Sequence, residues 1–132
     1  MGLDVSHGCW HGAYSAFHRW RTELARVAGI DLLAMEGFED LRDIYAGKER
    51  GPGMKWSALK PDVLLVLLSH SDCDGKIPWK KCEKLAARLE ELLPLLPVKD
   101  CGGYTENWQA KTRVFIDGLR LAYSLKEDVR FY

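Results

Sequence analysis

The sequence predicts a small α+β protein, a single domain over residues 1–132 in which three main helices dominate and a few short strands complete the fold. Apolar residues recur at helical spacing in three separate segments. Short extended-looking runs lie near both ends of the chain. A length of 132 residues suits one domain, and neither a linker nor an internal repeat divides it.

The first helix is expected after a glycine-rich turn. Asp4 and Val5 begin the chain in an extended conformation, and residues 6–12 are predicted to form the turn. Spacings of three and four then mark one buried helical stripe, and Gly29 is placed to end the helix. The stripe consists of Ala13, Phe17, Trp20, Leu24 and Val27.

The middle of the chain has weaker patterns than the segments on either side. A weaker helix is predicted around Phe38, Leu41 and Tyr45, and the glycine-rich residues 47–53 after it are predicted to be a loop. Residues 63–68 are all apolar and are predicted to be a buried strand, although periodicity in so short a run also allows a helix.

Two more helical stripes and a final strand complete the prediction. One helix begins at Pro78, and Pro94 ends it. The other begins near Thr105. Residues 128–132 alternate like a strand that could pair with residues 3–5. The two stripes consist of Cys82, Leu85, Leu89 and Leu92, and of Trp108, Thr112, Phe115, Leu119 and Ala122.

Composition narrows the classes of partner and the cellular location. The 19 basic and 19 acidic side chains balance, which argues against binding to bulk nucleic acid or to an anionic membrane surface. The start of the chain lacks the pattern of a secretion signal, and the longest apolar run is too short to span a bilayer. The four cysteines form no CxxC pair and are expected to be reduced thiols in the cytoplasm.

Residues 70–75 combine His70, Asp72 and Asp74 with Gly75 after the apolar run. Imidazole and carboxylates at this spacing suit a divalent metal, and the same three side chains are candidate catalytic acids and bases. The loop does not match a calcium-binding EF-hand in either register. Counting from His70 puts Lys81 at the twelfth position, and counting from Asp72 puts Lys76 and Ile77 where a ligand and a glycine belong. A tight turn whose aspartates bond backbone N–H groups and cap the next helix is the competing interpretation.

Residues 4–14 form the second polar segment. They lead directly into a helix N-terminus, where unpaired N–H groups and the helix dipole favour an anion. Trp10 and Tyr14 offer flat faces for a base or a sugar. The predicted ligand-binding residues are His7, Trp10, His11, Tyr14, Ser15 and Arg19, with His18 and Arg21 as further candidates.

Three functional hypotheses follow, and the first two require that the first strand lies beside residues 63–68, so that both polar segments share one pocket. The first is capture of a small anionic, nucleotide-like molecule without turnover. The second is a hydrolase that depends on a divalent metal cofactor. The third is a protein–protein effector. Homo-oligomerisation is left open. The metal ligands of the second hypothesis would be Asp4, His7, His70, Asp72 and Asp74.

The motifs SHxxWxGAYSxF at residues 6–17 and HSDCDGxI at residues 70–77 are similar to those of a family of small hypothetical proteins from bacteriophages and bacteria. The resemblance extends to the FIDGLR segment at residues 115–120. It implies a phage or prophage setting, hence the host cytosol, and little chemistry. Small phage proteins often act against host defence, for example by sequestering nucleotide signals, so a counter-defence role is one expectation.

Overall fold

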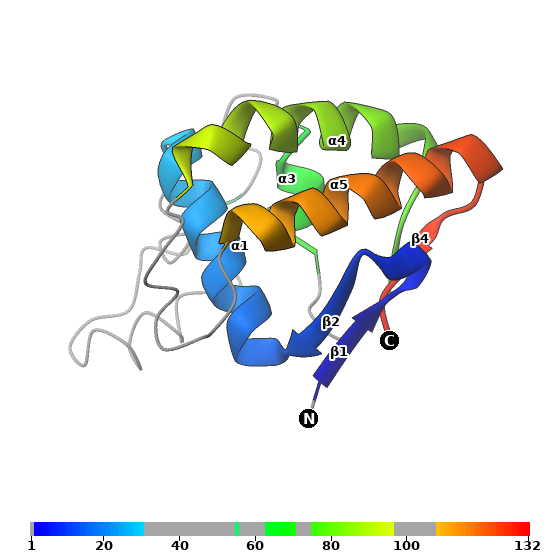
Figure 1. The fold of residues 1–132 in the computed structure, drawn as a ribbon, viewed down its shortest axis with the longest axis horizontal. Helices are drawn as coiled ribbons and strands as arrows, with labels where there is room; N and C mark the ends of the chain where they lie inside the picture. Colours follow the sequence, from blue (N-terminus) through cyan, green and yellow to red (C-terminus); the bar gives the residue numbers. More distant parts are fainter. Residues whose placement is uncertain (1, 31–54, 56–62, 71–74, 97–107) are drawn as a thin grey trace.

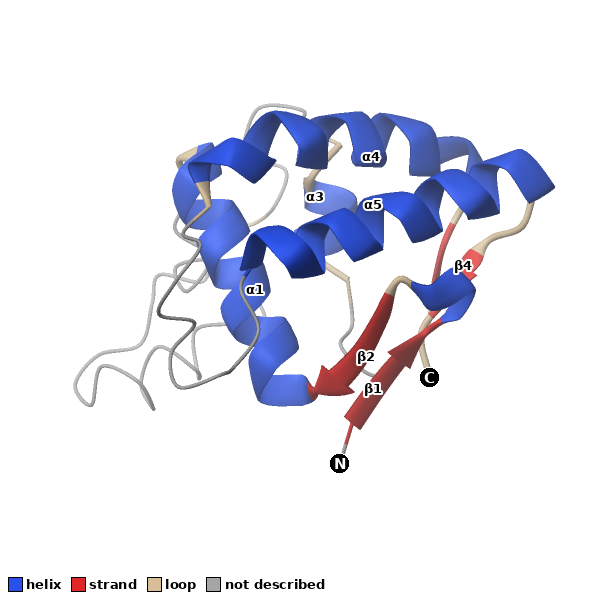
Figure 2. Ribbon diagram, in the orientation of Figure 1, coloured by secondary structure: helices blue, strands red, loops and turns tan. Residues whose placement is uncertain are grey.

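The computed structural model describes residues 2–30, 55, 63–70, 75–96 and 108–132. Within these ranges the chain forms four helices and four short strands in two small antiparallel sheets, which confirms the α+β prediction (Figures 1 and 2). The weak helix expected around Phe38, the loop at 47–53 and the start of the last helix near Thr105 lie outside the described residues.

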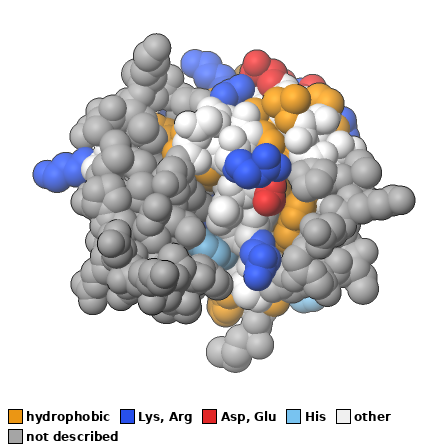
Figure 3. Space-filling model, turned by 90° about the vertical axis from the view of Figure 1, so that its left-hand side faces the viewer, with side chains coloured by type: hydrophobic (Ala, Val, Ile, Leu, Met, Phe, Trp, Pro, Cys, Tyr) orange, Lys and Arg blue, Asp and Glu red, His pale blue; other side chains and the backbone are white. Residues whose placement is uncertain are grey.

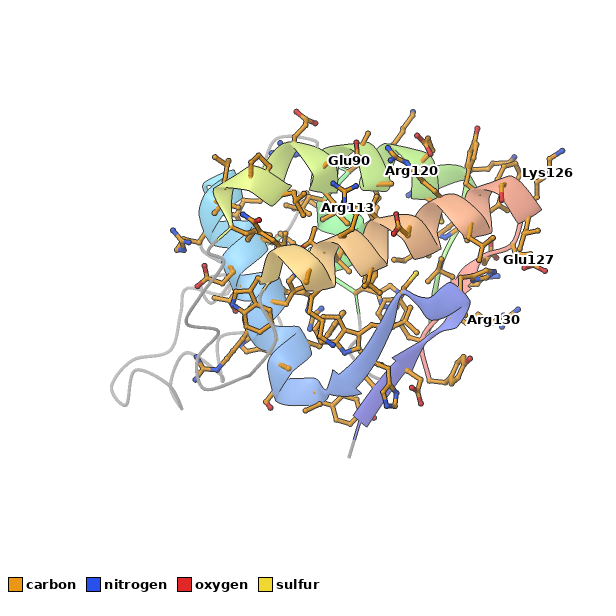
Figure 4. All side chains as sticks on the ribbon, in the orientation of Figure 1. Glu90, Arg113, Arg120, Lys126, Glu127 and Arg130 are labelled. Atoms are coloured by element: carbon orange, nitrogen blue, oxygen red, sulfur yellow. The ribbon has the colours of Figure 1, made fainter. Side chains whose placement is uncertain are left out.

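Two long helices, α4 (Trp79–Leu92) and α5 (Trp108–Leu125), lie side by side, and α1 (Tyr14–Ala28) crosses them at one end (Figure 1). On their outer surface Glu90 accepts hydrogen bonds from Arg120 and from Arg113, the latter at 3.2 Å (Figure 4). The bond from Arg120 is the main reason that the pKa of Glu90 is lowered. None of the helices in the described ranges has the length and apolar character needed to cross a bilayer.

The predicted stripes of α1, α4 and α5 form most of the core. Phe17, Trp20 and Leu24 of α1 are fully buried, as are Leu85 and Phe115 from the other two helices. The single turn η4 (Leu93–Leu95), which contains a proline, follows α4 as expected. Gly29 ends α1 with a φ of 83°. Its N–H donates to the Arg26 carbonyl, and the N–H of Ile30 donates to the Ala25 carbonyl.

Aromatic side chains hold the N-terminal hairpin against α1 and α5. The ring of Trp10 stacks on that of Trp20 at 5.2 Å between centroids and meets Phe17 edge-on. Trp20 also contacts Phe115 at 4.9 Å, and its indole N–H donates to the buried Thr112 hydroxyl at 2.8 Å. Each such aromatic pair contributes roughly 0.5–1.5 kcal/mol beyond its buried area.

Strands β1 (Gly2–Val5) and β2 (Trp10–Ala13) form an antiparallel hairpin in which Asp4 faces His11. Strands β3 (Lys76–Ile77) and β4 (Val129–Arg130) form the second sheet. The segment after β4 joins the two, because Asp4 and Tyr132 exchange backbone hydrogen bonds of 2.8 and 2.9 Å. The predicted pairing of the two chain ends is therefore confirmed.

The predicted strand at residues 63–68 is wrong, because this segment forms a turn and the short helix α3 (Leu65–Leu68). The amide of Leu68 donates to the Leu64 carbonyl at 3.0 Å, and that of Ser69 donates to Leu65 at 2.9 Å. Leucine favours helices, and a run of six apolar residues has no period that would exclude one. Buried Arg21 then stabilises the end of α3 by donating to the His70 carbonyl at 2.6 Å.

The turn predicted over residues 6–12 is only partly correct. The turn η1 covers Ser6–Gly8, whereas Trp10, His11 and Gly12 belong to strand β2. His7 and Gly8 both have positive φ, as the central residues of a tight hairpin turn of type I′ require. Ala13, which the sequence assigned to the buried helical stripe, is instead the exposed residue that precedes α1.

Candidate functional site

The hairpin delivers the chain to the N-terminus of α1 without a capping side chain. Ala13 occupies the N-cap position with extended backbone angles, and its side chain has no oxygen that could accept from the first N–H groups of the helix. Serine, threonine, aspartate or asparagine is usual at this position. The start of α1 therefore keeps its capacity to attract an anion.

Trp10 is the first residue of β2, the strand that leads into this helix, and it is 3% exposed. One neighbour is Trp20, and the ammonium of Lys111 lies 4.6 Å from the centre of the ring. The flat face expected for a ligand is thus used within the protein. The indole Nε1, in contrast, is buried without a hydrogen-bond partner among the described residues.

Gly12 lies next to two hydrogen-bond donors. A methyl group built on its Cα would lie 3.4 Å from Trp10 Nε1 and 3.7 Å from Lys111 Nζ. The same ammonium donates to the backbone carbonyl of His11 at 3.3 Å. One N–H donor and one cation therefore converge on the residue that almost adjoins the uncapped start of α1. We call this arrangement of Trp10, Gly12 and Lys111 the anion corner.

The other predicted ligand residues are spread around the hairpin. The His11 side chain is 87% exposed and bonds Asp4 across the strands through Nδ1. This bond leaves its other ring nitrogen directed to solvent. Tyr14 is half-buried, and Ser15 and Arg19 are exposed in the first turns of α1.

His7 lies at the opposite, closed end of the hairpin. Its Nδ1 is 2.8 Å from the Ser6 hydroxyl, and its Nε2 is 2.9 Å from a carboxylate oxygen of Glu127. The Ser6 hydroxyl also accepts from the Arg130 amide at 2.8 Å. The His7 side chain is 12% exposed, so this group of contacts is partly shielded from water.

His70 has a different set of neighbours. Its ring stacks on Phe131 at 4.0 Å between centroids, and its Nε2 donates to the Lys76 carbonyl at 3.1 Å. The expectation that His70 shares a pocket with residues 4–14 depended on a strand at residues 63–68. This segment instead forms a turn and helix α3. Asp72 and Asp74 lie outside the described residues. Within the described ranges no three histidine, cysteine, aspartate or glutamate side chains are grouped to hold a metal ion.

Two buried cysteines are free thiols, as predicted for reduced cysteines. Burial, together with the neighbouring Cys82, raises the pKa of the Cys9 thiol to about 12. Burial and the charge of Asp128 raise the pKa of Cys82 to about 11. Both side chains therefore stay protonated at neutral pH and are poor nucleophiles.

Sequence reasoning missed Lys111 and Glu127, which come from the far end of the chain. Lys111 lies beside the buried stripe of α5, and a lysine at such a position is normally interpreted as part of the solvent-exposed face of the helix. Glu127 follows the end of α5 in a charged segment of ordinary appearance. Only the hydrogen bonds to residues some hundred positions away distinguish them.

Charge on the left-hand side of the molecule as drawn in Figure 1 is mixed. Figure 3 shows basic and acidic side chains interspersed among the described residues of this face. This distribution agrees with the balanced composition. On this face the described residues form no extended basic track of the kind that binds a nucleic-acid backbone.

Together the fold and these contacts define a small α+β protein with a polar N-terminal hairpin. Comparison with protein-family models, with curated protein sequences and with solved structures gave no match.

Proposed function

We propose that the protein captures a small anionic, nucleotide-like ligand at the anion corner without changing it. The observation that carries the proposal is the buried Trp10 Nε1, which has no acceptor among the described residues and lies close to Gly12, as does the Lys111 ammonium. A buried N–H without an acceptor costs roughly 1–3 kcal/mol, and a ligand oxygen that reaches it would recover part of that. In a phage setting, such capture would sequester a host nucleotide signal.

The neighbouring groups complement a phosphate in three ways. Lys111 supplies a full positive charge, the uncapped first turn of α1 supplies N–H groups, and Arg19 lies one turn along the exposed side of the helix from Ser15. Because Lys111 covers the indole ring, the ligand would enter between the ammonium and the ring edge. The long lysine side chain is the part that would move.

The indole N–H signals of ¹⁵N-labelled protein test this proposal during titration with inorganic phosphate, AMP and adenosine. We expect the Trp10 signal to move with phosphate and AMP but not with uncharged adenosine. The Trp20 signal is an internal control, because its N–H already donates to Thr112. Recovery of unchanged AMP after prolonged incubation would separate capture from hydrolysis.

Two variants localise the binding. Gly12→Ala places a methyl group at ordinary contact distance, so the protein should fold while AMP affinity falls at least tenfold. Lys111→Met should weaken AMP binding comparably. Lys80→Met is the matched control, because Lys80 also lies over a tryptophan ring, that of Trp79, at 5.9 Å. Equal AMP binding by Gly12→Ala and wild type would refute the proposed site.

A further inference from the structure

In the described residues, unusual backbone conformations occur at or next to one contact, the hydrogen bond between His7 and Glu127. Only two non-glycine residues in the described ranges have positive φ, namely His7 at 61° and Lys126 at 56°. His7 is itself a member of the contact with Glu127, and Lys126 immediately precedes Glu127. Left-handed conformations of non-glycine residues persist where the surrounding structure imposes them, and they are concentrated at functional sites.

The backbone conformation at the end of α5 directs the Glu127 side chain toward the hairpin turn. The Lys126 amide donates to the Tyr123 carbonyl at 3.2 Å, and the Glu127 amide donates to Ala122 at 3.0 Å. This pair of bonds is the Schellman motif, in which the left-handed position is usually glycine. With lysine there, the chain still turns back sharply, and the carboxylate of the next residue reaches the hairpin turn (Figure 4).

The hydrogen bonds at this contact have a defined direction. A carboxylate can only accept, so the proton of neutral His7 sits on Nε2, which donates to Glu127 at 2.9 Å. The unprotonated Nδ1 then accepts from the Ser6 hydroxyl at 2.8 Å. The Arg130 amide donates to the same hydroxyl oxygen and fixes its position. Serine, histidine and glutamate are thus linked in the order nucleophile, base and orienting group.

Helix α5 supports the turn from behind. A methyl group on Gly118 would lie 2.9 Å from the His7 carbonyl oxygen and 2.5 Å from the Cys9 sulfur. The helix backbone therefore approaches the turn as closely as glycine allows. A nucleophile and a base held on such a rigid support satisfy the positional requirement of covalent catalysis.

We propose that Ser6, His7 and Glu127 form a serine-nucleophile site for carboxylic esters. Ser6 Oγ attacks the ester carbonyl carbon while His7 Nδ1 takes the hydroxyl proton. Collapse of the tetrahedral intermediate breaks the bond to the alcohol, which leaves with that proton and gives acyl-Ser6. Water then attacks the acyl group, loses a proton to Nδ1, and releases the carboxylic acid as Ser6 regains its proton. In the familiar serine proteases the histidine faces the serine through Nε2 and the carboxylate through Nδ1. Here Nδ1 faces Ser6 and Nε2 faces Glu127.

A positively charged residue lies beside the proposed nucleophile, because the Arg130 amide bonds the Ser6 hydroxyl. Arg130 is exposed and lies beside the same turn (Figure 4). This site does not rest on the proposed ligand capture. In the anion corner the Trp10 indole nitrogen approaches Gly12, which pairs with Leu3 toward the open end of the hairpin, whereas Ser6 and His7 follow the Val5–Trp10 pair at its closed end.

The full-length protein can be tested with p-nitrophenyl acetate and with a fluorophosphonate probe, which forms a stable adduct when a serine oxygen displaces fluoride. We expect p-nitrophenolate release above the buffer rate, and peptide mapping should place the adduct on Ser6. Ser6→Ala should abolish the adduct, and Ser124→Ala should retain it. An adduct on another residue, or none on the folded protein, would overturn the proposal.

Variants of the other two residues separate catalysis from bracing of the turn. His7→Asn keeps a residue that tolerates positive φ and should slow acylation at least 100-fold. Glu127→Gln should slow acylation at least tenfold, and Glu91→Gln should leave the rate unchanged. Circular dichroism and the melting temperature establish that each variant is folded. If folded His7→Asn acylates at the wild-type rate, the assignment of His7 as the base is wrong.

Discussion

Gly118→Ala decides whether the close approach of α5 to the hairpin turn governs the stability of this fold. Alanine in place of glycine inside a helix normally stabilises by roughly 0.5–1 kcal/mol. Here the new methyl group would lie 2.5 Å from the Cys9 sulfur, 2.9 Å from the His7 carbonyl oxygen and 3.0 Å from the Cys9 Cα. Ordinary contacts between heavy atoms lie near 3.5–4.0 Å, so the turn or the helix must shift by about 1 Å.

Overpacking of this kind costs typically 1–3 kcal/mol, and the upper end applies because two of the three opposing atoms belong to the backbone. After the helical gain is subtracted, we expect Gly118→Ala to lose about 2 kcal/mol, a Tm lower by roughly 6–10 °C in a domain of this size. Urea unfolding measures the free energy directly. In a double-mutant cycle, Cys9→Ala should reduce the penalty by removing the nearest atom. A Gly118→Ala protein as stable as wild type, or more stable, would refute the reasoning, because helix propensity alone predicts that result.

Three further predictions concern single side chains. Lys126→Gly should raise the free energy of unfolding by about 0.5–1 kcal/mol in urea, because glycine adopts the left-handed conformation without strain. The Trp79 amide donates to Asp128 at 2.9 Å and is the main cause of the lowered pKa of that carboxyl. Asp128→Asn should therefore lower Tm at pH 7, and the difference from wild type should disappear as the pH falls below the usual carboxyl range and through the lowered pKa. A Tm difference that persists undiminished at pH 2 would contradict this. Iodoacetamide at pH 8 should leave Cys9 unmodified in the native protein, and peptide mapping that finds rapid native-state labelling would show that the thiol is not protected by burial.

The helices were predictable because their signal is local. Apolar residues at three- and four-residue spacing place Phe17, Trp20 and Leu24 on one face whatever the rest of the chain does. Strand β2 was missed because a histidine and a glycine in four residues resemble a turn. Only pairing with β1 makes the segment a strand, and pairing depends on the register of a partner rather than on local composition.

The sequence shows which segment is rich in polar and aromatic residues, but not how those residues are arranged. The crowding of such residues between positions 4 and 14 draws attention to the segment that forms the hairpin. It does not show that the Trp10 ring packs in the core while its N–H has no acceptor in the described part of the chain. Nor does it reveal that His7 pairs with Glu127, since a contact between opposite ends of the chain leaves no pattern in either segment.

Helix α5 connects the two proposed sites physically. Lys111 and Gly118 stand about two helical turns apart on the same face, roughly 10 Å along the axis. Lys111 contacts β2 near the start of α1, and Gly118 contacts the turn that carries His7. A shift of α5 along or away from the hairpin would therefore disturb both sites, whereas Lys111→Met removes a charge at only one. If Gly118→Ala weakens AMP binding while Lys111→Met leaves fluorophosphonate labelling of Ser6 intact, the hairpin and α5 act as one mechanical unit with two chemically separate ends.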